Sequence, residues 1–101
     1  MSKVSGGKAI IEKNVSPGSG LILVIDDEEI VRMMAESILV ECGYNVILAG
    51  SGREGLQKFR EAKDNIKAVL LDMAMPGLSG KEVYLELKKI LQEIEAASRN
   101  R

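Results

Sequence analysis

Short apolar runs along the chain alternate with longer segments in which apolar residues recur at helical spacing. Residues 21–25 read Leu-Ile-Leu-Val-Ile, a continuous apolar run that predicts a strand covered on both faces of a sheet. Residues 45–49 and 68–71 have the same character and predict two further strands. The last of these three strands ends at Asp72.

The intervening segments predict three helices, over residues 28–42, 51–63 and from residue 79 or 80 onward. Asp27 and Ser51 are the expected N-caps of the first two helices, and Gly43 suits the left-handed residue that follows the first. The residues of the first helix that we expect to face the core share a spacing of three and four: Ile30, Val31, Met34, Ala35, Ile38 and Cys42.

Alternating strands and helices predict an α/β domain with a parallel sheet and right-handed crossovers, over residues 21–101. Residues 1–20 are rich in Ser, Gly and Lys, which favours a flexible leader or linker. Within that leader, residues 8–13 contain a short apolar patch that could pair as an extra edge strand. The flexible leader is the favoured interpretation.

Composition narrows the classes of function. A chain of 101 residues is long enough for one core, and a net charge of −1 argues against a nucleic-acid-binding surface. The absence of histidine excludes Ser-His-Asp and Cys-His catalysis, and a single cysteine excludes an internal disulfide. No apolar run is long enough to span a bilayer, so a cytoplasmic protein without membrane contact is expected.

Three carboxylates follow the predicted strands. Asp26 and Asp27 follow the first strand and Asp72 the third, at the sheet edge where α/β proteins bind ligands. Two such charges ~5 Å apart repel by roughly 3 kcal/mol, so a cluster of them raises a pKa or binds a cation. Oxygen ligands suit Mg²⁺, and a carboxylate beside the metal can accept a phosphoryl group. The alternative is that these residues only cap a helix and begin a turn.

The motifs around these carboxylates resemble those of the response-regulator receiver domain of two-component signalling, in the same order and spacing. The most specific stretch is Leu-Leu-Asp-Met-Ala-Met-Pro-Gly at residues 70–77, and the other matching stretches are residues 23–29, 43–46 and 49–56. The resemblance implies a partial flavodoxin-like receiver fold whose three parallel strands lie in the order second, first, third.

The resemblance also implies a role for each site residue. Asp72 is similar to the phosphoacceptor, which takes its phosphoryl group from a phosphohistidine on a sensor histidine kinase or phosphotransfer protein. Asp27 resembles the direct Mg²⁺ ligand, Asp26 an acid that acts through water, and the backbone carbonyl of Ala74 the third protein ligand. The expected function is Mg²⁺-dependent phosphorylation of Asp72, in a signalling domain rather than an enzyme.

Other parts of the family pattern are not found. The family has a Ser or Thr after its fourth strand and a Lys after its fifth, and no such strand follows Asp72, so a truncated receiver is expected. The edge of the third strand would then be unpaired, and a homodimer through that edge or through the extended C-terminal helix is a hypothesis. Residues 7–13 resemble the family's fifth strand, although Asn14 stands where the family usually has Pro. If this segment docks beside the third strand, in the same chain or another, Lys13 could approach Asp72 and pair with the phosphate.

Three other classes of function are alternatives to a phosphoacceptor domain. A half-receiver that cannot switch would act only as a dimerisation or docking module, and this alternative stays open. An aspartate-nucleophile phosphohydrolase is disfavoured because Ala74 stands where that class supplies an acid. A dinucleotide-binding domain is excluded because no glycine-rich turn follows the first strand.

Overall fold

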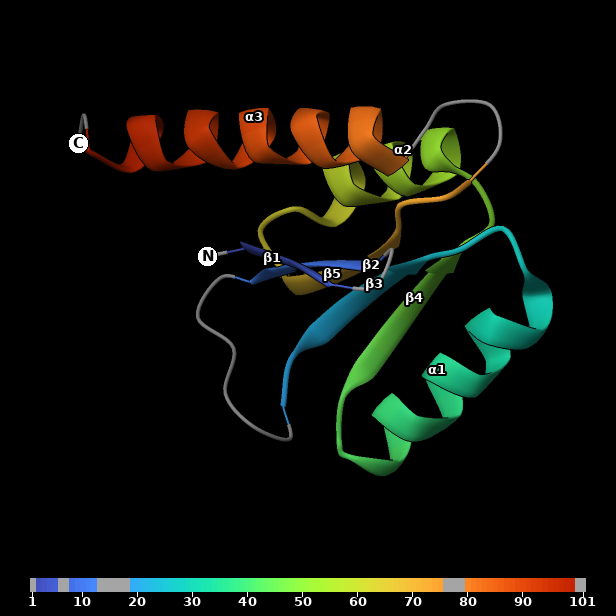
Figure 1. Ribbon diagram of the computed structural model, residues 1–101. Coiled ribbons are helices and arrows are strands. Elements are labelled where there is room, and N and C mark those ends of the chain that lie inside the picture. Colours follow the sequence, from blue (N-terminus) through green and yellow to red (C-terminus); the bar gives the residue numbers. More distant parts are fainter. Residues whose placement is uncertain (1, 6–7, 13–18, 76–79, 100–101) are drawn as a thin grey trace.

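The computed structural model describes residues 2–5, 8–12, 19–75 and 80–99 of the chain. In these residues five strands form one sheet in the order β1-β2-β5-β3-β4, with three helices around it (Figure 1). The elements in chain order are β1 (Ser2–Ser5), β2 (Lys8–Glu12), β3 (Leu21–Ile25), α1 (Glu29–Glu41), β4 (Asn45–Ala49), α2 (Gly52–Ala62), β5 (Ile66–Asp72) and α3 (Gly80–Arg99).

The parallel half of the sheet confirms the predicted strand order. β3 lies between β4 and β5 and pairs with both in parallel. Its side chains from Leu23 to Ile25 are almost completely buried, as expected for a central strand covered on both faces. The carboxyl ends of β3 and β5 therefore lie at the same edge of the sheet, directly before Asp26 and at Asp72.

The N-terminal residues differ from the expected flexible leader. β1 and β2 pair antiparallel with each other, and β2 pairs antiparallel with β5, so the sheet has five strands rather than three. The physical reason is that β2 supplies hydrogen-bond partners for the backbone groups along the edge of β5. Ile11 is also buried by this pairing, with 3% of its surface exposed. The hypothesis of a homodimer through an unpaired β5 edge is therefore wrong, because β2 covers that edge.

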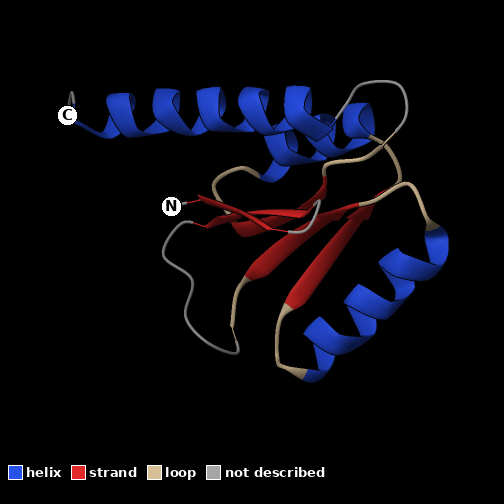
Figure 2. Cartoon of the chain, in the orientation of Figure 1, coloured by secondary structure: helices blue, strands red, loops and turns tan. Residues whose placement is uncertain are grey.

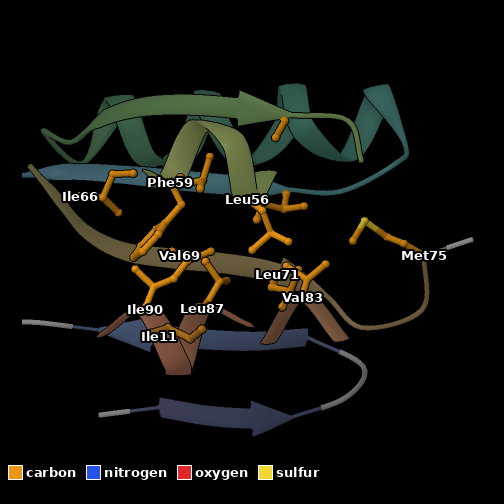
Figure 3. Packing of buried hydrophobic residues seen from close by; sticks show 13 residues of the cluster. Ile11, Leu56, Phe59, Ile66, Val69, Leu71, Met75, Val83, Leu87 and Ile90 are labelled. Carbon is orange, nitrogen blue, oxygen red and sulfur yellow. The ribbon is translucent and has the colours of Figure 1, made fainter. Parts of the chain in front are cut away.

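The helices cover the sheet unequally. α2 and α3 lie on one face and α1 lies on the other (Figure 2). The larger core cluster fills the space between the sheet and the α2–α3 pair (Figure 3), where Phe59, Leu87 and Val83 are at most 1% exposed. Val83, Leu87 and Ile90 share one stripe of α3, and this stripe packs into the core.

The expected burial of α1 is wrong. No residue of α1 is buried, and Ile30 and Ile38 are 71% and 60% exposed; Met34 and Cys42 are exposed too. Ala35 and Leu39 alone among its apolar residues pack against the smaller cluster, which centres on Ile22 and Val24. The reason is that α1 packs mainly against β3 and β4, and the apolar side chains on the rest of its surface stay exposed.

The predicted helix ends are confirmed in two of three cases. Ser51 caps α2 by accepting a hydrogen bond from the Glu54 N–H, and Gly43 follows α1 with a φ of 99°. The N-cap of α1 is Glu28 rather than Asp27, and it makes no side-chain cap bond. Among the described residues, no helix is both long and apolar enough to cross a membrane.

Candidate functional site

The three predicted carboxylates converge at the carboxyl edge of the sheet. Asp26 and Asp27 follow β3, Asp72 ends the neighbouring parallel strand β5, and one oxygen from each lies within 4.8 Å of the other two. Parallel pairing of β3 with β5 causes this convergence, because it brings two carboxyl ends to one edge. Asp26 is buried, Asp72 is half-buried and Asp27 is exposed.

Asp26 accepts hydrogen bonds at both carboxylate oxygens and at its backbone carbonyl. Its Oδ1 accepts the Glu28 N–H at 3.0 Å, and its Oδ2 accepts from the ammonium of Lys8 at 2.8 Å. Its backbone carbonyl accepts from Arg32 at 2.8 Å. Both carboxylate oxygens of a side chain that is only 4% exposed are thus already paired. Asp26 therefore suits a ligand that acts through water better than one that contacts a metal directly.

Asp72 is oriented by the backbone two residues further along the chain. Its Oδ1 accepts the Ala74 N–H at 2.9 Å, and one oxygen of its carboxylate lies within 4.8 Å of oxygens of Asp26 and Asp27. Ala74 itself is exposed, and the role of its carbonyl as a ligand stays a prediction.

Lys13 lies outside the described residues. Because β2 runs antiparallel to β5, Glu12 pairs with Ala68, while Lys8 at the other end of β2 pairs with Asp72. The lysine that the structure brings to the carboxylates is therefore Lys8.

Sequence reasoning missed two basic residues of this site, Lys8 and Arg32. The hydrogen bond that Lys8 donates to Asp26 raises the pKa of Lys8 above its ordinary value of 10.5. Partial burial acts against this rise, and the charges of Asp26, Asp72 and Glu28 add to it. The sequence feature that could have pointed to Lys8 was its position directly before the apolar run at residues 9–11. That feature could not show which way the strand would run beside β5.

The donor set fits Mg²⁺. The cluster offers carboxylate oxygens only, and Mg²⁺ prefers a few such oxygens together with water. Asp27 and Asp72 are the residues whose carboxylates could contact the ion directly. Asp26, whose oxygens are already paired, could contact it through a bound water.

Known proteins resemble this chain in the region that builds the site. Response regulator RR06 of Streptococcus pneumoniae is 44% identical over 68 residues, which are 67% of this chain and 30% of that protein. Chemotaxis protein CheY of Thermotoga maritima is 37% identical over 70 residues, covering 68% of this chain and 57% of that protein. The structure of chemotaxis protein CheY4 of Vibrio cholerae superposes with a TM-score of 0.66 at 30% identity, over 73% of this chain and 60% of that one.

The chain spans less than two thirds of the length of each of these relatives. The family model described as the response regulator receiver domain matches residues 22–96, which is most of the chain. The α/β fold, the strand order and the acidic edge agree with that match. The chain belongs to the response regulator receiver domain family.

Proposed function

We propose that this domain accepts a phosphoryl group on Asp72 in an Mg²⁺-dependent reaction, with a phosphohistidine of a sensor histidine kinase or phosphotransfer protein as the donor. The observation that carries the proposal is the convergence of Asp26, Asp27 and Asp72 within 4.8 Å at the sheet edge. Membership of the receiver family supports the signalling role. A domain that is itself modified in this way is a signalling component rather than a conventional enzyme.

The side chain of Asp72 is prepared for attack on phosphorus. The Ala74 N–H holds Oδ1, so Oδ2 is the nucleophile. A bond forms between Oδ2 and phosphorus while the bond from phosphorus to the donor nitrogen breaks, and the donor keeps that electron pair. The attacking group is the carboxylate form of Asp72, so this step releases no proton from the side chain.

The metal would be held by Asp27, by Asp72, by the Ala74 carbonyl and by a water bound to Asp26. Mg²⁺, when bound, supplies positive charge to the oxygens of the transferring group. The protein's own contribution is to hold Asp72 at the end of β5, beside the two other acids. The Glu28 N–H and Lys8 hold Asp26 in place and thereby maintain the shape of the acidic edge.

The test is incubation with a small phosphodonor and Mg²⁺, followed by intact-mass measurement. The wild-type chain should gain one phosphoryl group, Asp72→Asn should gain none, and a chelator should abolish the gain. Asp64→Asn, at an exposed acid in the turn after α2, is the matched control and should behave as wild type. A gain that survives Asp72→Asn contradicts the proposal. A folded wild-type chain that gains no mass contradicts it too and favours the docking module.

A further inference from the structure

We infer that Lys8 is the built-in cation of the acidic site: it neutralises Asp26 before phosphorylation and pairs with the phosphoryl group once Asp72 carries it. This inference rests on the proposed function. Nothing in the chain after Asp72 supplies such a lysine at the end of a described strand, so the N-terminal hairpin supplies it from the opposite direction.

The register of β2 places Lys8 beside Asp72. The two residues are direct cross-strand partners, so their side chains lie on the same face of the sheet, roughly 5 Å apart at Cβ. That face is the one of Ala68 and Leu70, while Val69 and Leu71 point into the larger cluster. The stem of Lys8 therefore starts next to the nucleophile rather than next to Asp26.

The ammonium of Lys8 reaches past Asp72 to the neighbouring strand. Its Nζ lies 2.8 Å from Oδ2 of Asp26, which follows β3 on the far side of β5. Strand order thus requires the side chain to cross the end of β5, and Asp72 ends that strand. A lysine ammonium has three donors, and one bond to Asp26 leaves two for another anion at this place.

Charge explains why the ammonium would change partner. The site holds three carboxylates, the ammonium of Lys8 and the guanidinium of Arg32, which donates to the Asp26 backbone carbonyl. Phosphorylation replaces the single charge of Asp72 by about two negative charges and three acceptor oxygens. The Lys8 side chain is 42% exposed and its stem is flexible, whereas Asp26 is fixed by the Glu28 N–H. Lys8 is therefore the mobile partner, and the phosphoryl oxygens are the stronger attraction.

The same geometry makes Lys8 a competitor of the metal. An ammonium on Asp26 offsets one of the charges that would attract Mg²⁺, so its removal should strengthen metal binding. If Lys8 had only a structural role, its removal should weaken Mg²⁺ binding, because a disordered site binds metal less well. Opposite effects on metal affinity and on phosphorylation are thus the signature of this inference.

The experiment compares the full chain with Lys8→Met, with Lys8→Arg and with Lys89→Met, a charge-matched control at an exposed site on α3. Calorimetric titration with Mg²⁺ should show about three- to tenfold tighter binding in Lys8→Met. Phosphorylation by a small phosphodonor at saturating Mg²⁺ should be about 10- to 100-fold slower in that variant. Lys8→Arg should recover much of the rate, and Lys89→Met should match wild type in both measurements.

Circular dichroism checks that each variant folds. If Lys8→Met does not fold, Lys8→Gln keeps a donor for Asp26 without the charge and should show the same two changes. An unchanged phosphorylation rate, or weaker Mg²⁺ binding in the folded variant, overturns the role of Lys8 and leaves the proposed function intact. A wild-type chain that is not phosphorylated on Asp72 overturns both.

Discussion

Gly80, the first residue of α3, lies against the backbone that carries the phosphoacceptor. A Cβ atom built at this position would lie 2.5 Å from the carbonyl oxygen of Asp72 and even closer to the backbone of Met73. Backbone atoms cannot move aside as a flexible side chain can. A side chain at residue 80 would therefore displace either the start of α3 or the end of β5.

We expect Gly80→Ala to cost about 1–3 kcal/mol of unfolding free energy and to weaken Mg²⁺ binding, because the displaced segment carries Asp72. Denaturant unfolding and Mg²⁺ calorimetry measure the two effects. Gly20→Ala is the control: its φ of 116° makes any side chain strained, but Gly20 lies at the amino end of β3. This control should lose about 1 kcal/mol and keep its Mg²⁺ affinity. Equal metal affinity in both variants would contradict the prediction.

The acids of the site were predictable from the sequence and its basic residues were not. Asp26, Asp27 and Asp72 directly follow apolar strands, and parallel pairing then brings them to one edge whatever the rest of the chain does. Lys8 reaches the site only because β2 pairs antiparallel with a strand about 60 residues later, in one particular register. A contact that depends on a long-range register leaves no local pattern.

At the scale of the elements, α2 begins with two capping hydrogen bonds. Ser51 Oγ accepts the Glu54 N–H, and Oε1 of Glu54 accepts the Gly50 N–H at 2.7 Å. Lys58, one turn later, forms an ion pair with Glu54 at 3.2 Å. The hydrogen bond from Gly50, followed by that from Lys58, lowers the pKa of the Glu54 carboxyl below its ordinary value of 4.5.

The lowered pKa of Glu54 predicts a pH-dependent contribution of this cap. The carboxylate stabilises the folded state above pH 4.5, and the contribution disappears as the pH falls through the lower pKa of the folded state. Glu54→Gln should therefore be less stable than wild type at pH 7, by under about 1 kcal/mol because the side chain is solvent-screened. The difference should shrink at pH 3. Ser51→Ala should cost about 1 kcal/mol at either pH, because a hydroxyl does not titrate. Urea unfolding at the two pH values measures both, and a difference for Glu54→Gln that grows in acid would contradict the prediction.

The existence of the helices was easier to predict than their burial. Apolar residues at helical spacing identified α1, α2 and α3, and the stripe of Val83, Leu87 and Ile90 is buried as expected. The same spacing led to a wrong prediction of burial for α1, where Ile30 and Ile38 are exposed. Periodicity shows which side of a helix is apolar, but whether a neighbour covers that side depends on elements elsewhere in the chain.

At the scale of the whole molecule, the N-terminal hairpin completes the sheet. β2 pairs with β5 along its entire length, and Ile11 enters the larger core cluster together with Val69 and Leu87 (Figure 3). The hairpin thus contributes both to the core, through Ile11, and to the acidic site, through Lys8. Residues near the start of the chain thus share a sheet and a core with residues about 60 positions later, and we expect them to unfold as one cooperative unit.

Adjacent residues of β2 test whether the hairpin and the core unfold together, because these residues face opposite sides of the sheet. Ile11 is 3% exposed and Ile10 is 39% exposed. We expect Ile11→Ala to lower the free energy of unfolding by about 2–4 kcal/mol, a large part of the 5–15 kcal/mol typical of a small domain, and Ile10→Ala by less than about 1 kcal/mol. Thermal and urea unfolding measure the difference. Similar small losses for both variants would show that the hairpin detaches without disturbing the core, and the site would then have no fixed Lys8.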